Sequence, residues 1–398
     1  MTRRPRPFAV RSRIRNLRPW QVIASVVLLS SGLVLAGSIS RYVFNSQEPL
    51  ASNLATWARD HKLGRVVDEL EQLRYSSPPA DKPAEELASI SPTHTQHAPV
   101  SPSPTAGVAV SAAPTTQPFH PDALTVRVSP ALKNEGVWKS AREVNGTPAI
   151  WVTGIRPLKA APAVTATYAL VDQDLTYAAM WNGPEIPGKS GFSRYRSIGP
   201  DLHPYLIAAF NGGFRREHTR GGYFTEGKQL WKMNPEAATL GIDASGRIHI
   251  GLLNQEVMQV DMVSIRQNVR LLVQNAKSVV GGKLYGYGSW KDGNLYILRS
   301  AVCIRTDGKL LFAVMGPADA EQLAVALVRA GCKVAMQLDV NASWPKFSIY
   351  DPATPAPHTR WIDKRSTGAS DMFLTSAPKD FFALFDRTLP DALEAQLK

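Results

Sequence analysis

Alternation of apolar and polar residues over the C-terminal part of the chain predicts short β-strands separated by Gly, Pro and Asn turns. Clear examples of such strands are 149–153, 165–171, 239–242 and 247–250. Few segments show the 3.6-residue spacing of an amphipathic helix, and the clearest of these, 319–330, is followed by a glycine that suits a C-cap. The pattern therefore predicts an α+β fold, mostly antiparallel sheet with a few packed helices.

The strand predicted after this helix, 334–341, carries polar side chains at alternate positions. By parity, Gln337, Asp339 and Asn341 share one face, and the residues between them are apolar. A solvated strand face gives the same alternation. A row of polar groups at the end of a buried strand is also where functional side chains collect. The sequence leaves both interpretations open.

A second polar motif begins where the apolar strand 206–210 ends, at Asn211-Gly212-Gly213. Two glycines permit positive φ angles or the close approach of another group to the backbone. Taken alone, the motif fits an ordinary tight turn as well as a functional loop.

The loop after this motif is basic. Three arginines and His218 crowd between residues 215 and 220, and a second glycine pair leads on to Glu226-Gly227, which predicts a hairpin turn. A basic, glycine-flanked loop beside a strand end suits a phosphate or an acidic sugar, with Arg215 and His218 as contacts. An ordinary solvated loop has the same composition.

A third segment is the apolar strand 295–305, which is followed by a hairpin turn at 306–309 and a return strand at 310–315. Arg299 interrupts the apolar run and shares its parity with Cys303. The face that carries Arg299 is either solvated or lines a polar cleft, and position alone does not decide between them.

Together these motifs resemble the phosphodiester glycosidase domain, the domain of the uncovering enzyme that removes N-acetylglucosamine from a phosphodiester. The resemblance rests on Asn-Gly-Gly-Phe at 211–214, Arg-Ser-Ala-Val at 299–302 and Ala-Met-Gln-Leu-Asp at 335–339, and it spans residues 148–382. The chain departs from the family's pattern directly after this last motif. A run of glycine and serine is replaced there by Val-Asn-Ala-Ser-Trp at 340–344.

The resemblance implies hydrolysis of a sugar that is linked through its anomeric carbon to phosphate. Such a bond breaks through an oxocarbenium-like state, which needs a nearby carboxylate. A phosphodiester leaving group is already a weak base, so it needs cations more than a strong acid. We therefore expect Asp339 as nucleophile or base, Arg299 and Arg215 on the phosphate, Asn211 on a sugar hydroxyl or the turn, and Glu226 as an acid partner. The remaining candidates for substrate binding are Gly212, Gly213, His218, Gln337 and Asn341.

A second class of function stays open, which is a non-catalytic module that binds anionic cell-wall glycan. The altered loop after Asp339 fits a domain that binds such a glycan without cleaving it. Catalysis requires Asn211, Arg299 and Asp339 to converge, whereas a binding module needs only a groove.

The N-terminus accounts for most of the basic charge. The net charge of the chain is +12, and residues 1–19 hold seven arginines and no acid, which leaves about +5 for the rest. This distribution argues against a nucleic-acid partner, which would need a basic face on the folded domain. Residues 20–37 are apolar and uncharged, just long enough to cross a bilayer. The arginine bias predicts a single-pass protein of the cell membrane with its C-terminal domain outside; a cleaved signal peptide is the alternative.

These features divide the chain into five predicted parts. They are a basic cytoplasmic tail at 1–19, a transmembrane anchor at 20–39, a helical segment at 45–75, a Pro/Ser/Thr-rich linker at 76–122 and the glycosidase-like domain at 123–398. No cofactor is predicted, because the two cysteines and the scattered histidines lack the spacing of a zinc site. Cys303 and Cys332 fit either a disulfide or two buried thiols.

Overall fold

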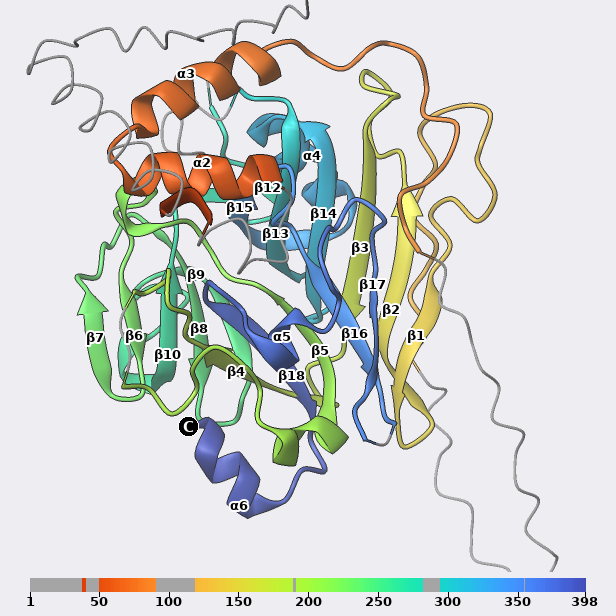
Figure 1. The fold of residues 1–398 in the computed structure, drawn as a ribbon. Coiled ribbons are helices and arrows are strands. Elements are labelled where there is room, and N and C mark those ends of the chain that lie inside the picture. Colours follow the sequence, from red (N-terminus) through yellow and green to blue (C-terminus); the bar gives the residue numbers. More distant parts are fainter. Residues whose placement is uncertain (1–37, 41–49, 91–118, 189–190, 282–293, 354) are drawn as a thin grey trace, which may run out of the picture. The chain divides into compact units, whose positions relative to one another are not determined.

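The computed structural model of the protein describes residues 38–40, 50–90, 119–188, 191–281, 294–353 and 355–398 (Figure 1). The predicted membrane span and most of the predicted linker lie outside these ranges. Within them, no helix combines the length and the apolar character that crossing a bilayer requires.

The described strands form three antiparallel sheets (Figure 1). The first sheet has eight strands in the order β1 (Lys139–Val144), β2 (Thr147–Ile155), β3 (Thr165–Val171), β14 (Leu310–Ala318), β13 (Ile297–Arg305), β15 (Cys332–Val340), β11 (Leu271–Gln274) and β12 (Lys277–Ser278). The second has five, in the order β7 (Lys228–Trp231), β6 (Tyr223–Thr225), β10 (Met262–Gln267), β8 (Ala238–Asp243) and β9 (Ile248–Leu252). The third also has five, in the order β17 (His358–Trp361), β16 (Phe347–Asp351), β5 (Leu206–Asn211), β18 (Phe381–Asp386) and β4 (Thr176–Trp181). The prediction of a mostly antiparallel fold is confirmed.

The helices of the described residues are few and mostly short. They are α2 (Leu50–Asp60), α3 (Gly64–Tyr75), α4 (Ala320–Arg329), α5 (Met372–Thr375) and α6 (Asp391–Glu394), with 3-10 turns η1 (Pro200–Tyr205), η2 (Arg216–His218), η3 (Gln259–Asp261) and η4 (Ala395–Leu397). Helices α2 and α3 lie within the helical segment predicted at 45–75. The chain falls into two compact units, one that includes α2 and a second that runs from Arg65 to Lys398.

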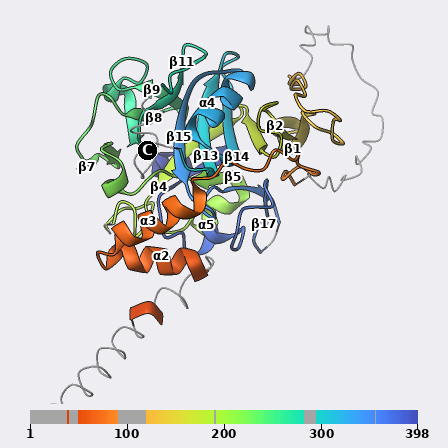
Figure 2. The same cartoon turned by 90° about the horizontal axis from the view of Figure 1, so that it is seen from above.

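In the second unit, the inner strands of the eight-stranded sheet are buried on both faces. One face packs against apolar side chains from the other two sheets, and the opposite face lies under α4 (Figure 1, Figure 2). Helix α4 begins at a capping box between Asp319 and Gln322 and is followed by Gly331 at a φ of +89°. Burial on both faces explains why β3 and β14 read as apolar runs without clear alternation.

Cys303 on β13 and Cys332 at the start of β15 are joined by a disulfide, and their Cα atoms are 5.7 Å apart. Both residues are fully buried on the α4 side of the sheet. The disulfide therefore links the two strands that carry Arg299 and Asp339.

The first part of the predicted linker lies against the folded domain. In the segment 84–90, the carbonyl of Ala88 accepts a hydrogen bond of 2.9 Å from the backbone of Lys364. Ser89 crosses directly over Gly154, where an added Cβ would lie 2.2 Å from the Ser89 hydroxyl oxygen. This stretch of chain therefore belongs structurally with the domain that follows it.

Candidate active site

Asn211 is the last residue of β5 and is fully buried. Its side-chain amide donates hydrogen bonds to the Ser300 hydroxyl (3.0 Å) and to the carbonyl of Gly212 (2.8 Å). Its side-chain carbonyl accepts one of 2.9 Å from the backbone of Lys346. Asn211 thus ties the end of the third sheet to β13 of the first sheet and shapes the turn that follows.

A β-bulge determines the direction of Asp339. Ser300 pairs with Asp339 across β13 and β15, but the next residue, Ala301, pairs with Gln337, so that Leu338 is the extra residue. Cross-strand partners share a face, which places Asp339 on the side of Ser300 and Gln337 on the opposite side, under α4. The parity prediction that put both on one face is therefore wrong. The interpretation of a solvated face is also wrong, because Gln337 is fully buried and Asp339 is 7% exposed.

Asn268 holds this bulge against the glycine turn. Its side-chain amide donates to the backbone carbonyls of Gln337 (2.8 Å) and Leu338 (2.6 Å), and its side-chain oxygen accepts from the backbone of Phe214 (3.0 Å). A Cβ on Gly213 would lie 2.6 Å from the Asn268 amide nitrogen. The bulge and the turn are therefore fixed relative to each other.

Asp380 lies beside the same turn because β5 and β18 are antiparallel. Asn211, the last residue of β5, pairs with Phe381, the first residue of β18, so Asp380 faces Gly212. The Gly212 backbone donates a 2.9 Å hydrogen bond to the Asp380 carbonyl, and an added Cβ would lie 2.4 Å from Oδ2 of that aspartate. The glycine is thus required for the close approach of another group, one of the two roles expected from the sequence.

A buried arginine is the partner of Asp380. Arg266 on β10 is 1% exposed, and its Nε donates to the Asp380 Oδ2 at 2.7 Å. Its Nη1 donates to the carbonyl of Gln267 at 2.6 Å. The guanidinium lies over the rings of Trp231 and Tyr223, at 4.9 and 5.4 Å from their centroids. A buried ion pair requires that its hydrogen bonds be satisfied, and the guanidinium of Arg266, which also donates to the Phe214 carbonyl, meets this requirement.

Asp339 and Asp380 form one buried group of charges with Arg266 and Lys379. Burial raises the pKa of Asp339; the positive charge of Lys379 and a 2.8 Å hydrogen bond from the Val340 backbone oppose this shift, and Asp380 adds to it. Burial also raises the pKa of Asp380, and Arg266 opposes that shift. The Asp380 Oδ1 is buried and accepts no hydrogen bond from the residues that the structure describes. Such carboxylates, with perturbed pKa values and close cations, are typical of functional sites.

Arg299 lies on the opposite face of β13, under α4, and is fully buried. Its guanidinium donates to the carbonyls of Ala318 (2.6 Å) and Leu295 (2.8 Å) and to the side-chain oxygen of Gln337 (2.7 Å). Burial lowers the pKa of Arg299 to about 10. These contacts make Arg299 a support for the strand that carries Asp339.

The other predicted residues lie in the loops around this centre. Arg215 donates to a carboxylate oxygen of Glu185 at 2.7 Å, and His218 is half-buried in η2. Glu226 occupies the predicted hairpin turn between β6 and β7, and its carboxylate accepts hydrogen bonds from the backbone of residues 193–194. Through these hydrogen bonds, Glu226 connects the β6–β7 hairpin to the segment at 193–194.

Asn341 shapes the loop that follows β15. Its side-chain oxygen accepts hydrogen bonds from the backbone (2.9 Å) and the hydroxyl (3.0 Å) of Ser343. Of the predicted residues, the structure brings Asn211 and Asp339 together through Ser300, with the two glycines beside them. Arg299 reaches the same strand only from its far face, so the expected convergence of three residues holds for Asn211 and Asp339 and is wrong for Arg299.

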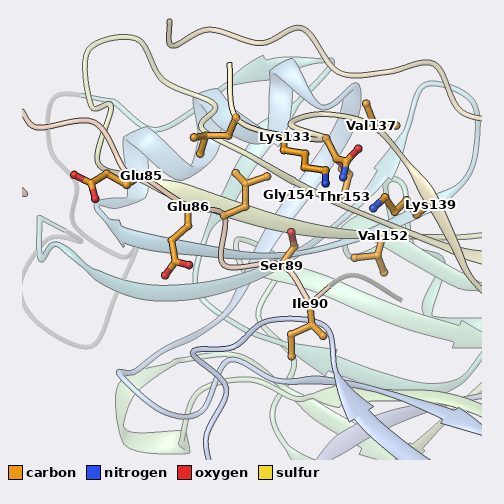
Figure 3. A pocket seen from close by; sticks show the side chains of 13 residues that line it. Glu85, Glu86, Ser89, Ile90, Lys133, Val137, Lys139, Val152, Thr153 and Gly154 are labelled. Atoms are coloured by element: carbon orange, nitrogen blue, oxygen red, sulfur yellow. The ribbon is translucent and has the colours of Figure 1, made fainter. Parts of the chain in front are cut away.

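A cavity of about 220 Å³ lies elsewhere, between the 85–90 segment and strands β1 and β2 (Figure 3). Its lining includes Ser89, Lys133, Thr153 and Gly154, and none of the predicted site residues lines it. In the described part of the chain, no three His, Cys, Asp or Glu side chains are grouped so as to hold a metal ion.

Two residues of this centre, Arg266 and Asp380, were missed by the sequence analysis although the signal was present. Arg266 directly follows an apolar residue of β10, as Arg299 does in β13. Asp380 directly precedes the apolar run that forms β18, so it is a polar residue at the edge of a buried strand. A buried charge needs a partner of opposite charge, and Arg266 and Asp380 pair with each other.

Residues 205–340 match the family model of phosphodiester glycosidase. This part of the chain is similar to the phosphodiester glycosidase domain. This confirms the resemblance seen in the sequence, and the matched range contains Asn211, Arg299 and Asp339. Arg266 lies within it as well, whereas Asp380 lies beyond its end.

Solved structures similar to this domain include two with low identity. One is the catalytic domain of zebrafish N-acetylglucosamine-1-phosphodiester alpha-N-acetylglucosaminidase, auto-inhibited by its pro-peptide. It is 16% identical at a TM-score of 0.40, over 62% of this chain and 86% of that one. The other is a hypothetical protein from Synechocystis, 10% identical at a TM-score of 0.35, over 61% and 63% of the respective chains. No curated protein matches the chain.

Proposed function

We propose that this protein hydrolyses the bond between the anomeric carbon of a sugar and phosphate, in a phosphodiester of a cell-envelope or exported glycan. The family match supports the reaction class. The observation that carries the assignment is the position of Asp339, a buried carboxylate that a β-bulge turns towards Ser300 and a second carboxylate, Asp380. Cations lie close to this pair, as the charge of the leaving phosphate requires.

In the proposed reaction, the ionised Asp339 accepts a proton from a water molecule as the water oxygen bonds to the anomeric carbon. The bond from that carbon to the phosphate oxygen breaks, and its electron pair leaves on the phosphate. The products are the free sugar and a phosphate monoester, and the proton on Asp339 passes to solvent. A phosphate oxygen is a weak base, so it departs without a strong general acid.

The other residues position this carboxylate and the substrate. Asn211 fixes the glycine turn, and Arg299 supports β15 through Gln337. Arg215 and His218, in the loop after β5, are the contacts that we propose for the remainder of the glycan. These roles account for a basic loop beside a buried catalytic centre.

The test of this function is turnover by the full-length protein of a panel of sugar-1-phosphodiesters that differ in the sugar and in the leaving alcohol. We expect release of free sugar and phosphate monoester in equal amounts from at least one of them. Binding of phosphoglycan without release would instead favour the binding module, the alternative suggested by the altered loop at 340–344.

Replacement of Arg299 by lysine tests the supporting role of this residue. Lysine keeps the charge but cannot reproduce three hydrogen bonds that point in different directions from one planar group. We expect a loss of about 2–3 kcal/mol in the free energy of unfolding, because buried carbonyls lose their donors. Urea denaturation measures it. Unchanged stability combined with a large loss of phosphodiester turnover would show that Arg299 acts on the substrate instead.

We also propose that the chain is anchored in the cell membrane with its folded domain outside, on the basis of the apolar stretch 20–37 and the arginines before it. Protease added to intact cells should then remove the C-terminal domain, as judged by an antibody against that domain. Full protection in intact cells, with digestion after lysis, would contradict this orientation.

A further inference from the structure

Lys379 presents an ammonium group near the carboxylates of Asp339 and Asp380. It is half-buried, and its Nζ lies 4.3 Å from the ring centroid of Trp344. In the described residues, this ammonium makes no hydrogen bond and no ion pair. It is nevertheless close enough to Asp339 for its charge to act on that carboxylate. A cation in this position has donor capacity left for a ligand.

The backbone around Lys379 is held on both sides. A Cβ on Gly183 would lie 2.6 Å from the carbonyl carbon of Lys379, so β4 and its following turn press directly against this residue. The next residue, Asp380, accepts the 2.9 Å hydrogen bond from Gly212. Lys379 is therefore fixed to the same glycine turn as the carboxylates and is not a freely moving surface lysine.

The buried ring of Trp344 is the aromatic contact of the Lys379 ammonium. It comes from the altered loop after Asp339, and it is 2% exposed. A second ammonium, that of the fully buried Lys346, lies 4.9 Å from the same ring centroid and 3.6 Å from the Met372 sulfur. Two ammonium groups thus lie around one indole ring, and the charge of one of them, that of Lys379, acts on Asp339.

We infer that Lys379, whose ammonium lies over the Trp344 ring, binds the phosphate group of the substrate while Asp339 acts at the anomeric carbon. The inference rests on the proposed function for the identity of the ligand. The anomeric carbon and the phosphorus of a sugar phosphodiester are joined through one oxygen. The carboxylate that acts at the carbon and the cation that binds the phosphate must therefore lie side by side, and they must not form an ion pair with each other. Lys379 and Asp339 meet this condition, and a hydrogen bond from Nζ strengthens as negative charge develops on the leaving phosphate.

The first test measures binding of inorganic phosphate to the full-length protein by calorimetry. Lys379→Met keeps the contact with the Trp344 ring and removes the charge, and we expect it to weaken phosphate binding about tenfold or more. Lys379→Arg keeps the charge and should remain within about threefold of the wild type. The matched control is Lys228→Met, because Lys228 also lies over an aromatic ring, at 5.2 Å from the centroid of Phe192. It should bind phosphate as the wild type does.

A second test needs no variant, so it does not depend on whether Lys379→Met folds. Phosphate should slow the acetylation of Lys379 in the wild-type protein but not that of Lys228, as measured by mass spectrometry. Equal protection of both, or phosphate binding by Lys379→Met at wild-type affinity, would overturn the inference, as would a wild-type protein that binds no phosphate. If phosphate binds through Lys379 but no sugar phosphodiester is hydrolysed, the anion site stands and the proposed reaction fails.

Discussion

Replacement of Asp339 by asparagine should lower the turnover of a sugar phosphodiester by about 10³ or more, which corresponds to roughly 4 kcal/mol of activation free energy. Asparagine has nearly the same shape, and it can still accept the hydrogen bond that Asp339 receives from the Val340 backbone. It cannot accept a proton from water. Steady-state rates of the two proteins at neutral pH give the comparison.

The pH dependence follows from the surroundings of Asp339. Burial raises its pKa, so the ionised form is lost at a higher pH than for an ordinary aspartate. As a base it must be ionised, and turnover should therefore fall as the pH drops through this raised value. A rate that stays constant down to the pKa of an ordinary aspartate, near 4, would contradict this assignment.

Stability should change in the opposite sense from activity. A carboxyl group whose pKa is higher in the folded than in the unfolded state destabilises the fold as the pH rises through that interval. Asparagine does not titrate. Asp339→Asn should therefore match the wild type in thermal unfolding below about pH 4 and equal or exceed it at neutral pH. Unfolding of the variant at neutral pH would make Asp339 a structural residue.

Replacement of Asp380 by alanine should cost about 3–5 kcal/mol of unfolding free energy, because it leaves the guanidinium of Arg266 buried without its carboxylate. For a domain of this size the midpoint of thermal unfolding should fall by about 10 °C. Urea and thermal denaturation at neutral pH measure both quantities.

An exposed ion pair on the same protein is the matched control. Arg270 and Glu236 are 3.1 Å apart, with side chains 58% and 74% exposed. Glu236→Ala should change stability by less than about 1 kcal/mol. Removal of both buried partners, with Arg266→Met added to Asp380→Ala, should restore part of the loss, because the unpaired charge is then gone. A stability of Asp380→Ala equal to that of the wild type would show that the buried ion pair contributes nothing.

The sequence was most informative about the strands and least informative about their mutual register. The apolar runs and turn residues predicted β5, β13, β14, the β6–β7 hairpin and α4 close to their observed bounds. Alternation along β15 placed Gln337 and Asp339 on one face. The extra residue at Leu338 separates them, and it is specified by contacts with Asn268, more than sixty residues away in sequence.

The same limit applies to the charges of the centre. Arg299 and Arg266 both lie in buried parts of strands, and the sequence does not say which of these two arginines lies beside the buried carboxylates. Sheet pairing decides it, because β10 carries Arg266 to Asp380 while Arg299 points under α4. Asp380 follows a loop without a recognisable motif, and only the antiparallel pairing of β5 with β18 brings it to the glycine turn.

The most direct test of the account is hydrolysis of a sugar-1-phosphodiester in water enriched in oxygen-18, with mass spectrometry of both products. Attack at the anomeric carbon, through Asp339, places the heavy oxygen in the released sugar and none in the phosphate monoester. Heavy oxygen in the phosphate monoester would mean that water attacks phosphorus. The protein would then be a phosphodiesterase of another kind, and the role assigned to Asp339 would be wrong.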